Sequence, residues 1–443
     1  MKNFEQFGIK IPEILLPKNK DLKTWCVVAC DQYTQDENYW KDAAQIAGKN
    51  PSSLNLILPE VYLGKSDTNS KIQKIQETMK TYLDEGIFDP PQKEFIYLER
   101  KTSYGRTRKG LVVAIDLDSY DWKSLSKAKI RATEATIVSR IPPRKAIRKG
   151  ASLELPHIML LVDDVENLLV EETGNLVKKE PAVYDGELMK NSGYISGWAV
   201  KDENALNHVY DSLLKIKEKN TDSDGNAFMF AVGDGNHSLA TAKTVWEEFK
   251  AEQRNCGVSE EKIAESELRY ALVEIVNIYD SGLTFEPIHR VLFNANADKL
   301  ILFLEKKLGG AVESLPDEKT LSDEVKKSQS DFGFVYKSDG KIQYKILRTK
   351  IQELAVSRFQ PEIDFFISEE NENGAKIEID YIHGDDEVFR LGEKDGVLSI
   401  MLPPVAKNSF FKTISERGSL PRKSFSMGEA SEKRFYLEAR KLF

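Results

Sequence analysis

The sequence predicts an α/β protein, with a mixed sheet over residues 1–295, an α+β domain over 296–418 and a basic tail over 419–443. Short apolar runs of strand length alternate with amphipathic helical patterns along the first two thirds of the chain. Several of these runs have no polar face, which is typical of strands covered on both sides. After about residue 295 the pattern changes to paired helices followed by a hairpin.

The first part of the chain supplies the elements of the expected sheet. Strands are expected at residues 22–29, 95–100, 110–117, 158–162, 227–232 and 269–279. Helices are expected at residues 37–46, 72–85, 204–219 and 236–253. The run at 110–117 is apolar almost throughout, so we expect it at the centre of the sheet.

The second part has a different order of elements. We expect helices at 298–308 and 318–328, then a hairpin of 332–337 with 341–348 around Ser338, Asp339 and Gly340. A helix near Ile363, strands at 376–382 and 397–402, and a helix at 408–417 complete the domain. The tail is expected to end in a charged helix and to fold back toward the core; the alternative is that it forms a homodimer contact.

Composition limits the classes of function. The 443 residues are 41% hydrophobic and 30% charged, with a formal net charge of −8, so no nucleic-acid binding is expected. The first residues have no signal-peptide core, and the run 158–162 is far too short for a membrane span. The three cysteines form no disulfide framework and no zinc pattern; Cys26 and Cys30 are expected on one side of a strand. We therefore expect a cytoplasmic protein that does not enter membranes.

One motif indicates a binding site. The strand at 227–232 runs into Gly233, Asp234, Gly235, Asn236, His237 and Ser238, where a helix begins. A helix start presents unpaired N–H groups and partial positive charge, and glycines let the backbone approach an anion. His237 and Thr241 can face one ligand together, and Asp234 is placed for a metal ligand or general base. A tight turn with a helix cap explains the same residues without a ligand.

The motif resembles the Asp-Gly-His-His-Arg signature of the bacterial family called domain of unknown function 1015. The likeness continues at residues 276–290 and 421–424, and more faintly at 131–136. This signature is similar to that of ParB-type nucleotide-binding domains, sulfiredoxin and a free-serine kinase of archaea, which implies a ParB/sulfiredoxin-like core with nucleotide phosphates on the turn. Asp234, Gly235 and His237 match the signature.

Two positions depart from the signature. Asn236 replaces a His, and Ser238 replaces the Arg that would grip phosphate with two hydrogen bonds. Tight nucleotide binding then requires another cation. The turn has no Cys, so the sulfiredoxin reaction is excluded.

Other residues are candidates for the same site. Arg140 and Arg144 belong to a basic segment, interrupted by Pro142 and Pro143, that is expected to start as a loop and could replace the missing cation. His289 and Arg290 are candidates for the same pocket, and Arg422 and Lys423 for a second phosphate. Asp31 or Glu134 could orient a substrate hydroxyl. Each of these residues also fits an ordinary structural or surface role.

We therefore expect a small-molecule phosphotransferase that uses Mg²⁺ with ADP or ATP, with Asp234 holding part of the metal. The resemblance implies a small hydroxyl-bearing acceptor such as serine. The first alternative is a nucleotide-gated switch of the ParB type without turnover. The second is a site that has lost nucleotide and holds another anion.

Overall fold

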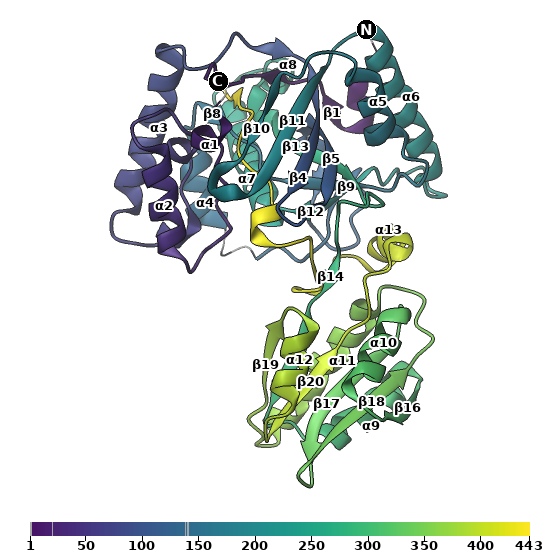
Figure 1. Cartoon of the computed structure of the whole chain (residues 1–443). Coiled ribbons are helices and arrows are strands. Elements are labelled where there is room, and N and C mark those ends of the chain that lie inside the picture. Colours follow the sequence, from purple (N-terminus) through teal and green to yellow (C-terminus); the bar gives the residue numbers. More distant parts are fainter. Residues whose placement is uncertain (1, 20, 138, 140) are drawn as a thin grey trace. The chain divides into compact units, whose positions relative to one another are not determined.

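The computed structural model describes residues 2–19, 21–137, 139 and 141–443, and the chain forms two compact units (Figure 1). The first comprises Met1–Leu283 with Glu429–Phe443, and the second comprises Thr284–Gly428. The boundary expected at residue 295 lies inside the second unit, because the strand His289–Phe293 pairs with two strands of that unit. Residues 419–428 belong to the second unit, and the rest of the tail to the first.

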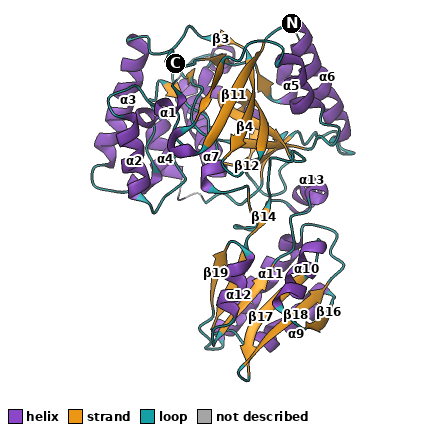
Figure 2. Cartoon of the chain, viewed as in Figure 1, coloured by secondary structure: helices purple, strands orange, loops and turns teal. Residues whose placement is uncertain are grey.

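A ten-stranded mixed sheet forms the centre of the first unit, which confirms the predicted α/β class (Figure 2). Its order is β10 (Tyr184–Glu187), β11 (Gly193–Val200), β4 (Phe95–Thr102), β5 (Thr107–Asp116), β13 (Tyr270–Asn277), β9 (Met159–Val162), β12 (Phe230–Asp234), β7 (Ile130–Ala132) and β6 (Tyr120–Asp121), with β1 (Ile9–Lys10) on β5. The pairs β13–β9, β12–β7 and β6–β7 are parallel and the others antiparallel. Every residue of β9 and β13 is buried, as expected for strands covered on both faces.

Helices cover this sheet. They are α1 (Leu22–Trp25), α2 (Glu37–Ala47), α3 (Thr68–Asp84), α4 (Ile141–Arg148), α5 (Thr173–Val177), α6 (Glu203–Lys219), α7 (Asn236–Asn255) and α8 (Glu260–Ala264). In Figure 1, α2, α3 and α4 lie to one side of the sheet and α5 and α6 to the other. None of the helices in the described ranges combines the length and apolar character that crossing a bilayer requires.

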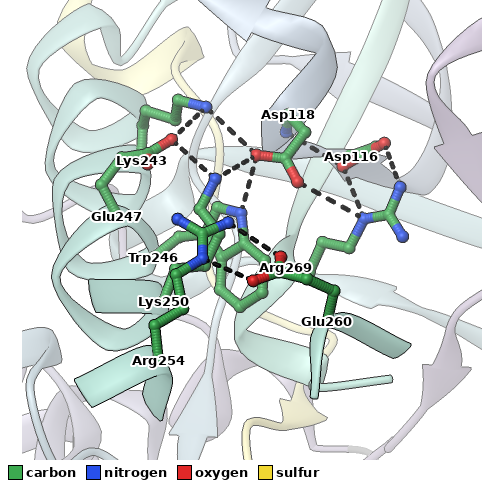
Figure 3. A network of polar contacts seen from close by, with 9 residues as sticks. All are labelled: Asp116, Asp118, Lys243, Trp246, Glu247, Lys250, Arg254, Glu260 and Arg269. Carbon is green, nitrogen blue, oxygen red and sulfur yellow. Dashed lines mark hydrogen bonds and ion pairs between the residues drawn. The ribbon is translucent and has the colours of Figure 1, made fainter. Parts of the chain in front are cut away.

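Helix α7 begins within the motif, and polar groups of its side chains contact Asp118. Figure 3 shows Lys243, Trp246 and Lys250 of α7 pointing toward Asp118, whose Oδ1 accepts hydrogen bonds from Lys250 Nζ at 2.7 Å and Trp246 Nε1 at 2.9 Å. Burial would raise the pKa of Asp118, but these hydrogen bonds and the two lysine charges hold it below its ordinary value. The middle of α7 is thereby held beside Asp118, which follows β5.

The second unit has an antiparallel sheet with helices, as expected for an α+β domain. Its order is β16 (Ala311–Leu315), β18 (Lys341–Arg348), β17 (Phe332–Ser338), β20 (Val397–Met401), β15 (His289–Phe293) and β19 (Glu378–Ile382). Its helices are α9 (Ala297–Leu308), α10 (Glu318–Lys327), α11 (Ala355–Glu372), α12 (Asp385–Gly392) and α13 (Lys407–Arg417). Three two-stranded pairs complete the chain: β2 (Glu13–Ile14) with β3 (Gln92–Lys93), β14 (Glu286–Pro287) with β21 (Phe425–Ser426), and β8 (Leu153–Glu154) with β22 (Arg440–Lys441).

The strand predicted at 22–29 is wrong. Residues 22–25 form α1, and the following residues pair with the C-terminal tail instead of the large sheet. The N–H of Tyr436 donates to the carbonyl of Val27, and the N–H of Ala29 donates to that of Arg434, both at 2.9 Å. The apolar run is therefore covered by the tail, and Cys26 and Cys30 do not share a face of a strand.

The charged helix predicted for the tail is also wrong. Residues 434–440 are extended and buried throughout. Their polar residues Arg434, Tyr436, Glu438 and Arg440 alternate with apolar ones, which is a strand period, but the charged side chains face inward. The loop that the sequence predicts before residue 144 is not observed, because Pro142 and Pro143 lie in the first turn of α4. Proline lacks a backbone N–H, and in the first turn of a helix that N–H would have no helical partner.

Buried ion pairs hold the tail in the first unit. Glu274 of β13 pairs with Arg108 of β5 and with Arg434 of the tail, and Arg434 also pairs with Glu438 at 2.5 Å. Glu274 and Glu438 are fully buried. Burial would raise the pKa of Glu274, but the two arginines hold it below its ordinary value. Removing one charge would therefore leave another buried without its partner.

We expect Arg434→Met to lower the free energy of unfolding of the first unit by about 3–5 kcal/mol, the usual result of breaking a buried ion pair. All five tryptophans lie in this unit, so tryptophan fluorescence during urea denaturation reports on it. Arg254→Met, at the exposed pair with Glu260, is the control and should show no measurable change. Equal stability of the two variants would contradict the role given to the buried network.

Candidate functional site

The motif forms a sharp turn between β12 and α7. The register between β12 and β9 shifts between Val232 and Asp234, which leaves Gly233 as a bulge. Gly235 is the N-cap of α7 and has a left-handed backbone, with φ of 84°. A Cβ atom at Gly235 would lie 3.0 Å from Cγ1 of Ile158. The left-handed backbone therefore favours glycine here, and the close approach of Ile158 leaves little space for a Cβ atom.

The helix start is uncapped. Gly235 has no side chain that could accept from the first turn, and among the described residues nothing accepts from the backbone N–H groups of Asn236 and Ser238. The side chain of Asn236 is turned away to Thr133, with both of its hydrogen bonds at 3.3 Å. The turn therefore offers backbone donors and positive helix charge to an anion.

A carboxylate and a lysine lie beside this turn. Asp234 Oδ1 accepts from the N–H of Gly235 at 2.9 Å, and Asp234 Oδ2 lies 3.4 Å from Nζ of Lys433 in the tail. In the described part of the chain no three His, Cys, Asp or Glu residues cluster as metal ligands would. Mg²⁺ fits this donor set only with Asp234 as a single protein ligand, since Mg²⁺ commonly completes its shell with phosphate oxygens and water.

His237 and Thr241, the pair predicted to face one ligand, are joined by a hydrogen bond within α7. The hydroxyl of Thr241 donates to the carbonyl of His237 at 2.7 Å, and Nε2 of His237 accepts from the N–H of Ile137 at 3.4 Å. Thr241 lines a cavity next to the turn, but its hydroxyl is engaged with the helix backbone.

Ser238 links the turn to this cavity. Its Oγ lies 2.7 Å from Nε2 of His157, and Nδ1 of His157 lies 3.0 Å from the hydroxyl of Tyr436. That hydroxyl also accepts from the N–H of Cys30 at 3.2 Å. The three side chains Ser238, His157 and Tyr436 thus form one hydrogen-bonded row along the cavity wall.

The cavity has a volume of about 130 Å³, roughly ten times what one water molecule needs. Among its polar lining residues, Glu60 accepts from Nε of Arg144 at 2.8 Å. Burial raises the pKa of Glu60 above its ordinary value, although Arg144 opposes the shift. A carboxylate with a raised pKa in a mostly apolar cavity is typical of a catalytic acid or base.

The remaining candidates from the sequence are placed as follows. Asp31 follows Cys30 of the cavity wall, and its Oδ1 accepts from Gln32 at 3.0 Å. Glu134 is half-buried and follows Thr133, which contacts the turn. Arg144 lines the cavity but is paired with Glu60. Arg140 lies outside the described residues.

Four candidates belong to the second unit. His289 is buried there: its Nδ1 accepts from the N–H of Leu402 at 3.0 Å, and its Nε2 lies 3.4 Å from Asp385. Arg290 is fully buried and donates from Nε to Gln360 at 2.8 Å. Arg422 and Lys423 are exposed in the segment before β21. The structure places none of the four in the lining of the cavity.

Sequence reasoning missed Glu60, His157, Lys433 and Tyr436. His157 lies just before β9, and because β9 is antiparallel to β12, the start of β9 lies beside the end of β12, where Met159 is opposite Asp234. The strand order would have revealed His157, but spacing along the chain does not give that order. Lys433 and Tyr436 lie in the tail, for which the sequence predicts a charged helix that folds back toward the core.

A family model described as "Protein of unknown function (DUF1015)" matches residues 13–366. No curated protein matches. Among solved structures, a free serine kinase in complex with AMP has 11% identity and a TM-score of 0.36, over 75% of this chain and 92% of that one.

Two further solved structures have similar scores. A conserved hypothetical protein from Pyrococcus furiosus has 11% identity and a TM-score of 0.35, over 75% of this chain and 97% of that one. SbnI with a C-terminal truncation, from Staphylococcus aureus, has 9% identity and a TM-score of 0.34, over 72% and 83%.

We expect Gly235→Ala to destabilise the first unit more than Gly225→Ala does. Both glycines have φ of 84°, but a Cβ at Gly225 has open space around it. A left-handed alanine costs roughly 1–2 kcal/mol, and the contact with Ile158 adds to that only at Gly235. Urea denaturation followed by tryptophan fluorescence measures the difference. Equal losses would show that the turn relaxes freely and is not held against β9.

Proposed function

This chain belongs to the family described as protein of unknown function (DUF1015), and for this member we propose that a phosphate-bearing small molecule binds with its phosphate on the first turn of α7. The observation that carries the proposal is the uncapped start of α7, where the N–H groups of Asn236 and Ser238 have no acceptor in the described chain. Lys433 beside Asp234 adds a cation. Backbone donors, helix charge and a nearby lysine together favour an anion.

ADP or ATP with Mg²⁺ is the ligand that fits this arrangement best. Asp234 would hold the metal from one side, with phosphate oxygens and water completing its shell. Lys433 would replace the Arg that the motif lacks at position 238, as a point charge and not as a two-pronged donor. The Mg²⁺ would neutralise charge on the phosphates.

The cavity beside Ser238 would hold the molecule that receives the phosphoryl group. The acceptor's hydroxyl oxygen would form the new bond to phosphorus while the donor's bond breaks, and a carboxylate would take the hydroxyl proton. Glu60 is the better candidate for that carboxylate than Asp31 or Glu134, because it lines the cavity and its pKa is raised by burial. Serine is the acceptor that the resemblance of the motif implies.

The alternative is a nucleotide-gated switch without turnover. This alternative is favoured because the charged residues of the site already form ion pairs with each other, Asp234 with Lys433 and Glu60 with Arg144. Nucleotide would then displace these pairs and change the shape of the first unit instead of entering a reaction.

We expect Lys433→Gln to weaken binding of ADP and ATP about tenfold, the effect of losing a charge-assisted contact of about 1.4 kcal/mol. Isothermal titration with and without Mg²⁺ measures the affinity. Lys441→Gln changes an exposed lysine of the same tail and should bind like the unchanged protein. If neither nucleotide nor pyrophosphate binds the unchanged protein, the proposal is wrong.

Incubation with Mg²⁺, ADP or ATP and a panel of hydroxyl compounds that includes serine should give a phosphorylated product detectable by mass spectrometry. Glu60→Gln should slow its formation by about 10²–10⁴-fold, the usual contribution of a general base, while nucleotide affinity stays within a factor of three. Excess EDTA should stop the reaction. Nucleotide binding without any product, over a panel of hydroxyl compounds, would favour the switch and contradict the phosphotransferase.

A further inference from the structure

The cavity beside Ser238 is mostly aliphatic. Ten of its lining residues are apolar and come from several segments of the first unit: Leu56, Ile57, Leu58, Leu63, Met79, Ile147, Ala151, Leu153, Leu155 and Leu442. Aliphatic side chains offer no hydrogen bonds, so they stabilise a bound ligand only by burying its apolar surface.

The charged residues of the lining are matched within the protein. Glu60 pairs with Arg144, and Arg148 pairs with Glu154. Two cations and two carboxylates therefore leave the lining without net charge. A zwitterion such as serine would bring two charges against aliphatic walls, and burying a charge without a matching partner is costly.

Three of the uncharged polar side chains of the lining are contiguous. Ser238, His157 and Tyr436 form the hydrogen-bonded row described above, and Cys30 connects it to Glu60, whose N–H donates to the Cys30 carbonyl at 2.8 Å. Hydroxyl and imidazole groups both donate and accept, which suits a ligand hydroxyl. The cavity thus combines one polar strip with an aliphatic remainder.

We infer that the cavity binds an uncharged aliphatic alcohol, with the hydroxyl at Ser238 and the carbon chain against the leucine and isoleucine walls. This binding does not require nucleotide. The assignment of the alcohol as the phosphoryl acceptor rests on the proposed function, and it would replace serine with a more apolar compound.

Saturation-transfer NMR titrations with 1-propanol, 1-butanol, 1-pentanol and L-serine, without nucleotide, test the inference. Affinity should rise roughly fourfold with each added methylene, because burying a methylene contributes about 0.8 kcal/mol, and L-serine should bind more weakly than 1-pentanol. Flat affinities along the series, or tighter binding of L-serine, would overturn the inference. Neither result depends on nucleotide, so failure of the proposed function is measured separately.

Ala151→Phe should fill part of the cavity and abolish the increase in affinity with the length of the alcohol. Ala297→Phe, in α9 of the second unit, makes the same change at a residue that does not line the cavity and should leave the series unchanged. Circular dichroism checks that both variants fold. If Ala151→Phe does not fold, Leu63→Ser at a half-buried position of the cavity wall should weaken the binding of 1-pentanol more than that of 1-propanol. Equal effects on the binding of the two alcohols would overturn the inference.

Discussion

The buried carboxylate of Glu274 is the constraint on which the first unit depends. It lies on β13, near the middle of the sheet, and is fully buried. A buried charge costs several kcal/mol unless it is paired and hydrogen-bonded. Arg108 supplies one partner from the adjacent strand, but the other, Arg434, comes from the end of the chain. The sheet therefore has its full set of partners only when the tail is in place.

The same tail supplies two groups of the candidate site. Successive residues of an extended segment point to opposite sides, and Lys433 reaches Asp234 while the neighbouring Arg434 reaches Glu274. Tyr436 is two residues further and contacts His157. A lysine has a long flexible side chain, but here its backbone is fixed by the buried network one residue away. The same buried ion-pair network therefore stabilises the sheet and positions Lys433 and Tyr436.

This arrangement explains how far the sequence could be interpreted. The apolar runs and the amphipathic pattern predicted the type of β4, β5, β12 and α7; the bounds of α7 were nearly right, whereas β12 is Phe230–Asp234 and was predicted at 227–232. The tail was predicted wrongly, because charged residues usually face water, whereas the charged side chains of the tail pair with one another in the interior. The strand predicted at 22–29 was also wrong, because residues 27–29 pair with that tail and not with the large sheet. Sites assembled from distant segments, such as Ser238 with His157 and Tyr436, need the strand order, which periodicity does not contain.

The serine at position 238 also follows from its surroundings. A long cationic side chain starting there would occupy part of the cavity that Ser238 lines and would add an unmatched charge to a lining whose ion pairs balance. The short hydroxyl instead keeps the space open and bonds to His157. A cation near the turn is then supplied from the other side by Lys433. The short side chain at position 238 and the tail lysine therefore belong to one arrangement, in which the ion pairs of the cavity lining stay balanced and the additional cation lies at the turn.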